Sequence, residues 1–344
     1  MDYPGVADKV GYIKLPRFYA DFNRTTGRRC ATDIEAELKK LTDQNVNGII
    51  LDLRNNGGGS LRDVVEMSGY FIEEGPIVQV KARGRSPEIL ADTDESVQYD
   101  GPLIVMVNEF SASASEILAA ALQDYGRAVI VGSNNTFGKG TVQRFFDLDR
   151  AIRGNSDIKP LGQVKMTIQK FYRVNGGSTQ LKGVTPDIIL PDNWSYIKTG
   201  EQDQDYAMKW TEIEPVEYSQ NVTSLDNLAQ LKANSERRVA SNKVFQMVNE
   251  NAQRFKKQRD YTKYPLVLSS YQREDKAREE EADKYEDIFK PIDGLNIKNL
   301  AVDMKDIEID EAKEARNDEW LEGLQKDAYV EECLHIMNDM ISNK

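Results

Sequence analysis

Histidine and cysteine are scarce in this chain, and their scarcity narrows the chemistry open to it. The 344 residues include one histidine, His335, near the C-terminus, and two cysteines, Cys30 and Cys333. Two cysteines exclude a disulfide scaffold and a cysteine-rich zinc site, and they leave either one bridge or two free thiols. A mechanism that needs a histidine has only His335 to recruit.

Long apolar runs and dense basic clusters are missing too. No run approaches the roughly 20 apolar residues of a membrane-spanning helix, and residues 1–5 lack the basic and apolar pattern of a secretion signal. We therefore expect a soluble chain without an integral membrane segment. The net charge of −12 without a basic stripe argues against nucleic acid and anionic membranes as partners, because phosphate binding depends on dense Lys and Arg.

The residues that are present indicate two folded domains. Apolar residues make up 40% of the chain and charged residues 30%, which is enough apolar material for a packed core. Residues 1–195 carry 23 basic and 25 acidic side chains, whereas residues 196–344 carry 22 and 32. This change predicts a core at 1–195 and an acidic helical C-terminal domain at 196–344.

The first region alternates strand-like and helix-like segments, which predicts a mixed α/β fold. Strands are expected at residues 10–15, 48–53, 77–81, 103–108, 127–131, 141–145 and 162–172, and helices at 33–45, 61–71 and from 114 to 125. A loop is expected around residues 153–156. The second region is expected to form charged helices at 235–254, 274–289 and 312–341, with a linker or short strand at 291–308.

A serine that follows a buried strand and begins a helix can act as a nucleophile. Residues 110–116 place three candidates there, Ser111, Ser113 and Ser115, where backbone N–H groups at the helix N-terminus can stabilise an oxyanion. The alternative is a capping box, because Ser113 followed by Glu116 fits that motif as well. The residues alone leave both interpretations open.

Lys139 is the best candidate for the base that a serine nucleophile needs. It lies between Gly138 and Gly140, which permit close backbone approach, and near Phe137, which can exclude water. Burial can lower the pKa of a lysine far enough for its amine to accept a proton, as in Ser–Lys variants of the serine triad. A phosphate-binding loop is the rival interpretation, but its spacing fails and Gly140 replaces the hydroxyl that binds magnesium.

Three further features complete the candidate site. The glycine-rich turn at residues 55–59 follows a strand, so its amides can form half of an oxyanion hole, although an ordinary turn explains it equally well. Gln143 is expected to orient the Lys139 amine by a hydrogen bond. Asp124, at the helix end, can act similarly, although a packing role explains it better.

These motifs resemble the carboxyl-terminal processing peptidases, and within them the bacterial tail-specific proteases. The resemblance extends over residues 9–192, and the acidic helical remainder resembles the C-terminal extension of the tail-specific group. It rests on residues 50–59 (ILDLRNNGGG), 108–116 (NEFSASASE), 137–143 (FGKGTVQ), 170–180 (KFYRVNGGSTQ) and 182–187 (KGVTPD). The implied fold is an α/β peptidase core of mixed sheets and helices, crotonase-like or ClpP-like, followed by a mainly helical C-terminal domain.

The resemblance also assigns roles to individual residues. Ser113 is the implied nucleophile, Lys139 the general base, and Gln143 the residue that orients Lys139. The implied oxyanion hole combines the Ala114 N–H with the amide of Gly58 or Gly59. The implied supporting residues are Glu116, Asp124 and Thr136. Neither a metal nor an organic cofactor is expected.

The implied function is serine endopeptidase action on proteins with unstructured, apolar C-terminal tails. The resemblance places such an enzyme in the periplasm or cell envelope and allows an adaptor protein as a partner. Members of the family select tails through a PDZ domain, and none is expected before residue 9, so the chain is expected to be a fragment. The loop at residues 131–139 is also one residue longer than the family pattern, which can shift Lys139. The alternative is a catalytically latent fragment, or a non-enzymatic binding scaffold of the same fold.

Overall fold

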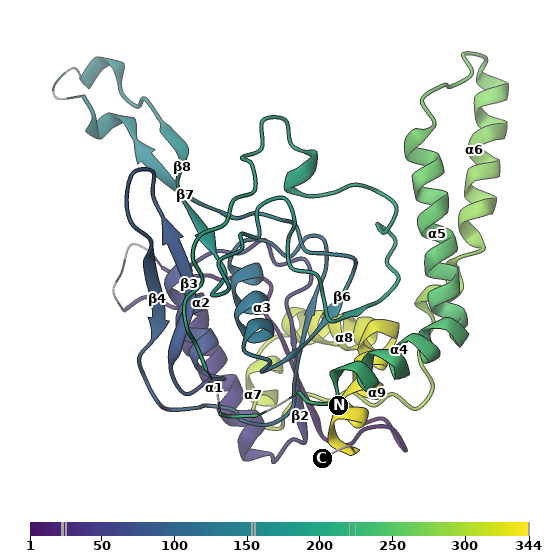
Figure 1. Cartoon of the computed structure of the whole chain (residues 1–344). Coiled ribbons are helices and arrows are strands. Elements are labelled where there is room, and N and C mark those ends of the chain that lie inside the picture. The colour runs from purple at the N-terminus through teal and green to yellow at the C-terminus, as the bar shows by residue number, and fades with distance from the viewer. Residues whose placement is uncertain are drawn as a thin grey trace.

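A parallel sheet forms the centre of the molecule. The computed structural model describes residues 1–21, 24, 26–152, 154, 156–219, 221–223 and 225–342. In this part of the chain, five parallel strands pair in the order β1-β2-β5-β6-β9 (Figure 1). They are β1 (Val10–Lys14), β2 (Gly48–Asp52), β5 (Leu103–Val107), β6 (Val129–Gly132) and β9 (Ile188–Ile189). The continuous apolar runs of β2 and β5 are buried throughout, as expected of parallel strands that are covered on both faces.

Three helices of the first region cover one face of this sheet. They are α1 (Cys30–Asp43), α2 (Leu61–Gly69) and α3 (Ala114–Asp124). Successive strand residues point to opposite faces, so Ile49 and Leu51 pack in the cluster with these helices while Ile50 packs in the cluster on the other face. The helix α2 begins where the Ser60 hydroxyl accepts a hydrogen bond from the Asp63 N–H, a typical N-cap.

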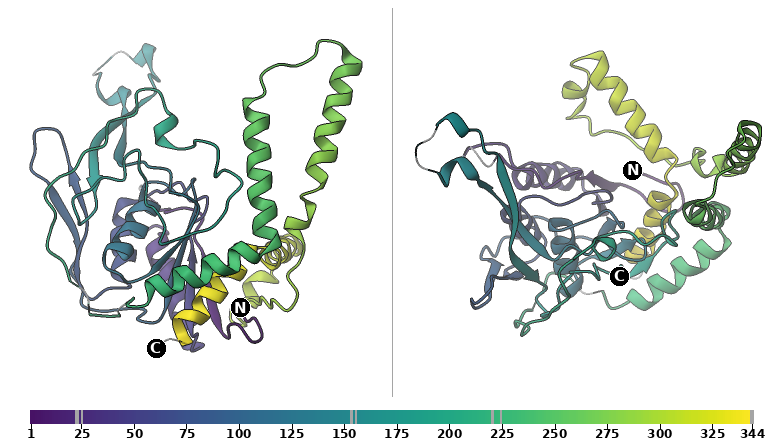
Figure 2. Two further views of the ribbon diagram at one scale, coloured as in Figure 1. Left: turned by 45° about the vertical axis from the view of Figure 1, so that its right-hand side comes forward. Right: turned by 90° about the horizontal axis from the view of Figure 1, so that it is seen from above.

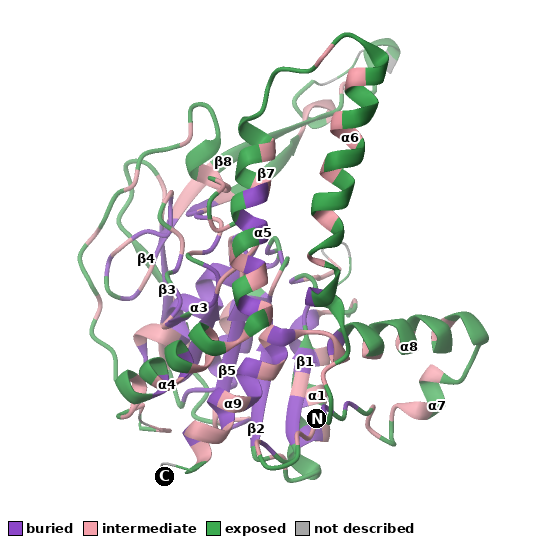
Figure 3. Cartoon of the chain, turned by 90° about the vertical axis from the view of Figure 1, so that its right-hand side faces the viewer, coloured by how far each residue is buried: buried purple, intermediate pink, exposed green. Residues whose placement is uncertain are grey.

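The C-terminal region covers the other face. The helix α9 (Ala328–Ser342) places Leu334 and Met337 in one cluster with Ile50, together with residues of α4 (Leu228–Ser241) and α5 (Lys243–Asp260). Figure 3 shows α9, with many of its residues coloured as buried, beside the strands. The two predicted domains therefore share a hydrophobic core, and the boundary at residue 195 stays a prediction.

A second, antiparallel sheet lies beside the first. Its strands pair in the order β4-β3-β8-β7. They are β3 (Gly75–Lys81), β4 (Glu88–Asp92), β7 (Thr141–Asp147) and β8 (Gln163–Tyr172). The hairpin of β7 and β8 projects from the core (Figure 1), and β7 is an edge strand of this sheet.

The remaining helices extend away from the core. The helix α5 and its partner α6 (Leu268–Asp283) form a long projecting hairpin, and α7 (Met304–Ile307) leads to α8 (Glu311–Gln325) (Figure 2). Short 3-10 turns occur at Leu148–Arg150, Ser156–Ile158, Glu201–Asp203 and Glu286–Phe289. No helix in the described ranges is long and apolar enough to cross a membrane.

The predicted α/β class and the helical C-terminal region are confirmed, but the three long helix predictions are wrong in their bounds. The helix predicted at 235–254 breaks at Asn242, whose side chain accepts hydrogen bonds from Val244 and Phe245 N–H and begins α5. The helix predicted at 312–341 breaks before Asp327, which caps α9 similarly. The one predicted at 274–289 begins earlier and ends at Asp283. Of the predicted loop at 153–156, residues 153 and 155 lie outside the described residues.

The shared core predicts that α9 stabilises the sheet of the first region. Replacing Leu334, which is fully buried, with alanine is expected to cost about 2 to 5 kcal/mol of unfolding free energy, because it leaves a cavity against the sheet. Chemical denaturation followed by circular dichroism measures this cost. Glu319→Ala, at an exposed position of α8, is the control. An unfolding midpoint unchanged by Leu334→Ala would contradict a shared core.

Candidate active site

The structure separates the three candidate serines. The Ser111 hydroxyl is buried and donates to the Leu53 carbonyl at 2.8 Å. The Ser115 hydroxyl is buried and donates to the Asn56 carbonyl at 2.8 Å. Only Ser113 is partly exposed, and it alone of the three lines a cavity. Two serines therefore hold the turn in place, and Ser113 is the one that can meet a substrate.

Ser113 has an unusual backbone conformation at the start of α3. Its φ is 60° and its ψ is −109°, in a region that non-glycine residues rarely adopt. Such strain persists where the surrounding structure determines it and is common at active sites. The buried hydroxyls of Ser111 and Ser115 supply that constraint on either side. The turn thus presents the Ser113 side chain at the helix N-terminus, where N–H groups favour negative charge.

Lys139 faces the same cavity as Ser113. Burial lowers the pKa of its ammonium, which the charge of Lys165 lowers further and those of Glu201 and Glu116 raise. The Lys139 Nζ donates to the Thr141 carbonyl at 2.6 Å. No hydrogen bond joins Lys139 to Gln143 among the described residues, although Gln143 lines the cavity. The role predicted for Gln143 therefore stays a prediction.

Glu116 connects the serine turn with the lysine loop. Its carboxylate is fully buried and accepts hydrogen bonds from the Ser113 N–H at 2.7 Å and the Lys139 N–H at 2.9 Å. It also accepts from the Thr136 hydroxyl and the Gly138 N–H, both at 2.7 Å. Burial raises the pKa of Glu116 to about 7, against the effect of these four donors. The serine turn and the lysine loop are thereby held at fixed positions by one side chain.

The glycine turn lies directly against the serine. A Cβ atom at Gly58 would come within 2.8 Å of the Ser113 Cβ and 3.0 Å of the Ala114 nitrogen, so only glycine permits this approach. The Gly58 N–H donates to the Asn56 side chain at 2.9 Å. Among the described residues, no side chain accepts a hydrogen bond from the Gly59 N–H or from the Ala114 N–H. This favours Gly59 over Gly58 as the second oxyanion donor.

The cavity is suited to an apolar side chain beside the serine. Its volume is about 450 Å³. Apolar groups on its walls come from Pro16, Leu61, Ile117, Val142 and Phe171, and polar or charged groups from Arg17, Gln143 and Lys165. The first residues of the edge strand β7 form one wall.

The remaining predicted residues have structural positions. Thr136 donates its hydroxyl to Glu116 and accepts from the Val184 N–H, so it supports the lysine loop. Asp124 lies at the opposite end of α3, about 16 Å from Ser113 by helix geometry, and pairs with Arg173 at 2.6 Å. It supports the site only through packing of the helix.

Two supporting residues were missed by the sequence reasoning. The buried Gln180 accepts from the Gly140 N–H at 2.8 Å and donates to Glu201, fixing the loop after Lys139. Asn56 donates to the Leu15 carbonyl while accepting from Gly58. For Asn56 a signal was available, because an Asn followed by glycines, here Gly57 to Gly59, is typical of an Asx turn. Nothing in the sequence indicates that Gln180 reaches back forty residues.

The structure also places the residues of the other candidate chemistries. The segment after Lys139 enters the strand β7, whereas a phosphate-binding loop leads into a helix. His335 lies on α9, on the other side of the sheet from α3, and its ring contacts Tyr3. Cys30 and Cys333 are buried free thiols. No group of three or more His, Cys, Asp or Glu side chains in the described ranges is arranged to hold a metal ion.

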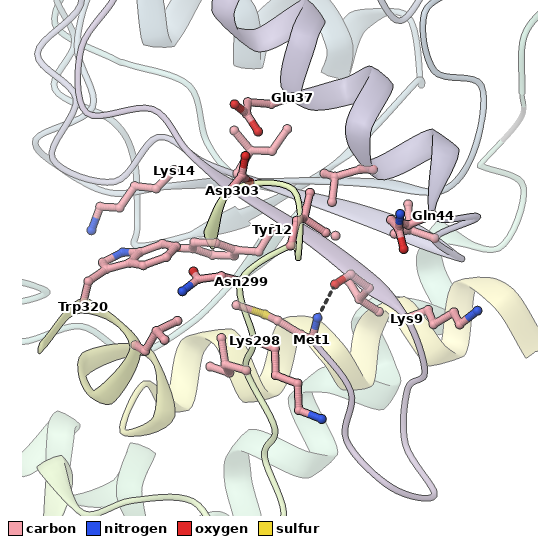
Figure 4. A pocket seen from close by; sticks show the side chains of 18 of the residues that line it. Met1, Lys9, Tyr12, Lys14, Glu37, Gln44, Lys298, Asn299, Asp303 and Trp320 are labelled. Atoms are coloured by element: carbon pink, nitrogen blue, oxygen red, sulfur yellow. Dashed lines mark hydrogen bonds between the residues drawn. The ribbon is translucent and has the colours of Figure 1, made fainter. Parts of the chain in front are cut away.

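A larger cavity, of about 770 Å³, lies elsewhere (Figure 4). It is bounded by β1, by α1 and by the segment around Asn299 and Trp320, and the Trp320 ring lies 6.2 Å from that of Tyr12. It contains neither Ser113 nor Lys139. Cavity size alone therefore does not identify the catalytic site.

The glycine turn gives a testable consequence. Gly59 has a φ of +151°, and a Cβ there would lie 1.9 Å from the Phe18 carbonyl oxygen. Gly59→Ala is expected to displace the turn, lowering kcat at least about tenfold through the oxyanion amide and costing about 1 to 3 kcal/mol of stability. Gly57→Ala is the matched control, because a Cβ at Gly57 meets nothing within 4 Å. Equal effects of the two substitutions on peptide hydrolysis would contradict this role.

Comparisons with known proteins identify the family of this chain. The model of peptidase family S41 matches residues 9–190, and that of the C-terminal domain of tail-specific protease matches residues 194–342. The tail-specific protease of Haemophilus influenzae is 42% identical over 254 residues, covering 73% of this chain and 35% of the relative. A carboxy-terminal-processing protease of Bartonella bacilliformis is 33% identical over 195 residues, covering 54% and 39%.

A solved structure is also similar. The photosystem II D1 C-terminal processing protease is 31% identical, covers 54% of this chain and 44% of its own, and gives a TM-score of 0.44. This chain thus spans between about a third and a half of the length of these relatives.

Proposed function

Because this chain belongs to peptidase family S41, we propose that it is a serine endopeptidase with Ser113 as nucleophile and Lys139 as general base. One observation carries the assignment: Ser113 is the only one of three adjacent serines that faces a cavity, and Lys139 lines that cavity. The membership does not favour a non-enzymatic scaffold.

In the proposed mechanism Lys139 acts in its neutral form. A neutral amine has two N–H bonds and one lone pair, so donation to the Thr141 carbonyl leaves the lone pair free to accept a proton. Lys139 takes the Ser113 hydroxyl proton as Oγ bonds to the scissile carbonyl carbon. The resulting oxyanion receives hydrogen bonds from the Ala114 and Gly59 amides.

The second half of the reaction releases both products. The tetrahedral intermediate collapses, the C–N bond breaks, and the protonated Lys139 returns the proton to the leaving amine. Water, deprotonated by Lys139, then attacks the acyl-enzyme. The bond from the acyl carbon to Ser113 Oγ breaks, Lys139 returns the proton to Oγ, and the carboxylate product leaves. No step requires a metal or an organic cofactor.

The substrates we propose are proteins with unstructured, apolar C-terminal tails. An extended tail can pair with the edge strand β7, whose first residues line the cavity, as peptides commonly add to sheet edges. The apolar walls of the cavity suit an apolar side chain at the cleavage point. By the same resemblance we propose a periplasmic or cell-envelope location and allow an adaptor protein as a partner.

Hydrolysis of an unfolded protein with an apolar tail tests the proposal. Ser113→Ala is expected to abolish cleavage and to leave the melting temperature nearly unchanged. Ser115→Ala is the comparison for a serine whose hydroxyl holds the turn, and it is expected to lose stability but to keep far more activity than Ser113→Ala does. If Ser113 were only a helix cap, its substitution would cost about 1 kcal/mol and cleavage would persist.

A fusion protein separates a latent site from a wrong assignment. If the wild-type chain cleaves nothing alone but does so when fused to the upstream region of a tail-specific relative, the site is correct and needs tail delivery. If the fused protein is also inactive, the assignment of Ser113 and Lys139 fails.

A further inference from the structure

The strand β1 is an edge of the parallel sheet, because it pairs only with β2. The Leu15 N–H donates to a carbonyl of β2 at 3.1 Å, so Leu15 faces that strand. Val10 faces the other way, since its N–H donates to the Met1 carbonyl at 2.8 Å. Backbone groups of successive strand residues alternate in direction. The N–H and C=O groups of Tyr12 and Lys14 therefore face outward, on the same side as Val10.

These outward groups have no partner in the described part of the chain. Beyond the pairing of β1 with β2, no described group bonds to the N–H or C=O of Tyr12 or Lys14. An edge strand with free N–H and C=O groups can pair with another extended chain. The cavity of about 770 Å³ lies beside these residues, so a ligand can reach the edge.

The cavity has an apolar wall on each side of the sheet. Leu41 and Val46 lie on the side of α1, whereas Tyr12 and Leu321 lie on the side of α9. Figure 4 shows the Trp320 ring beside that of Tyr12, at 6.2 Å. Side chains of an added strand alternate between the two sides. Apolar side chains of a bound chain therefore meet both walls.

The rim of the cavity has an excess of positive charge. Its three exposed lysines have no ion pair among the described residues: Lys9, Lys14 and Lys298. Of the three carboxylates on the walls, those of Glu37 and Asp303 both pair with Lys40 of α1, at 2.8 and 2.6 Å. Only the carboxylate of Asp2 is left to balance the three lysines. Acidic side chains at the ends of a bound chain would complement this rim.

The cavity continues toward the active site. Pro16, which follows β1, lines both this cavity and the one that contains Ser113. The next residue, Arg17, lines the Ser113 cavity alone. A chain extended along β1 therefore leads to the place where a peptide bond would be cleaved.

We propose that the outer edge of β1 is a second binding site for the substrate. An extended substrate segment with apolar side chains and acidic ends adds to the sheet beside Tyr12 and Lys14. The inference rests on the proposed function for the identity of its ligand. Main-chain hydrogen bonds provide affinity that depends little on sequence, which suits unfolded substrates. A segment held here raises the local concentration of the rest of the substrate at Ser113.

Peptide binding to the Ser113→Ala chain tests the site separately from catalysis. The probe is acetyl-Glu-Val-Thr-Leu-Thr-Val-Glu-amide, and isothermal titration calorimetry is expected to give saturable binding with a Kd below about 1 mM. The same peptide with Lys in place of both Glu residues is expected to bind at least about tenfold more weakly, because the rim repels it. Absence of binding by the acidic peptide at about 1 mM overturns the proposal.

Two substitutions of Lys14 isolate the backbone contact. Lys14→Pro removes the outward N–H, and proline is tolerated on an edge strand at such a position. Lys14→Ala removes the same charge but keeps the N–H. The proline variant is expected to bind the acidic peptide at least about fivefold more weakly than the alanine variant. Equal affinities of the two folded variants refute strand addition, and so does undiminished binding by Trp320→Ala, which removes part of the apolar wall.

Cleavage assays with Ser113 intact distinguish this site from the catalytic one. Relative to Lys14→Ala, Lys14→Pro is expected to raise KM for a long unfolded protein at least about fivefold and to leave kcat unchanged. Hydrolysis of a short peptide that fills only the Ser113 cavity is expected to be equal in both variants. An equal loss for both substrates would contradict a separate site. If the wild type cleaves neither substrate, the proposed function fails while the peptide-binding result still stands.

Discussion

Replacing Lys139 with alanine is expected to lower kcat/KM for tail cleavage by about 10⁴-fold, with little change in melting temperature. The loss follows because Lys139 is the lysine of the Ser113 cavity whose pKa burial lowers, whereas Lys165, the other lysine on its walls, is exposed. Lys139→Arg is the sharper variant, because arginine keeps the positive charge but stays protonated at all working pH values. It is expected to be equally inactive.

A lysine base predicts that kcat/KM rises with pH. Only the neutral amine accepts a proton, and burial lowers the pKa of Lys139 below its usual value of 10.5. Accordingly, kcat/KM is expected to be lowest at acid pH and to rise with pH until it levels above that pKa. Lys165→Ala is a control in the same cavity; its loss raises the pKa of Lys139 and moves the rise to higher pH. A rate independent of pH from about 5 to 10 contradicts a lysine base.

Glu116→Gln is expected to reduce kcat at least about 10²-fold and to cost about 2 to 4 kcal/mol of unfolding free energy. Each oxygen of the carboxylate accepts two hydrogen bonds. An amide replaces one oxygen with a donor, which then faces two other donors. The lost contacts release either the serine turn or the lysine loop, so the two catalytic groups are no longer held at a fixed distance.

Activity of the folded variant and a control substitution distinguish a positioning role of Glu116 from a simple loss of stability. Activity is measured well below the melting temperature of Glu116→Gln, where the variant is fully folded, and is expected to fall mainly in kcat. Glu88→Gln provides the control for a general effect of removing a carboxylate. If the folded Glu116→Gln variant cleaved at the wild-type rate, Glu116 would have no positioning role.

Much of the site was predictable because its residues lie in short segments. The serine turn, the lysine loop and the glycine turn each follow a strand of the first region, and parallel strands bring such turns to one edge of a sheet. The spacing of residues in the sequence does not show which of Ser111, Ser113 and Ser115 is the nucleophile candidate that faces the cavity. That choice depends on which hydroxyls the neighbouring Leu53 and Asn56 carbonyls already occupy.

The unpredicted parts depend on contacts between distant segments. The carboxylate of Glu116 accepts four hydrogen bonds only because a loop about twenty residues away folds over it, and Gln180 bonds to Gly140 across forty residues. Charge and periodicity gave helices in the C-terminal region, but not the packing of α9 on the sheet. The breaks at Asn242 and Asp327 were missed because both caps lie inside continuous helical patterns.

Chemical rescue of Lys139 tests the central claim most directly. Lys139→Cys is expected to be inactive, and alkylation of the introduced thiol with 2-bromoethylamine restores a primary amine at nearly the lysine position. Cys30 and Cys333 are fully buried, so identical treatment of the wild type serves as the control. We expect tail cleavage to return only in the alkylated variant, together with its rise toward alkaline pH. Full activity of Lys139→Cys before alkylation, or none after complete alkylation of the folded protein, would contradict Lys139 as the general base.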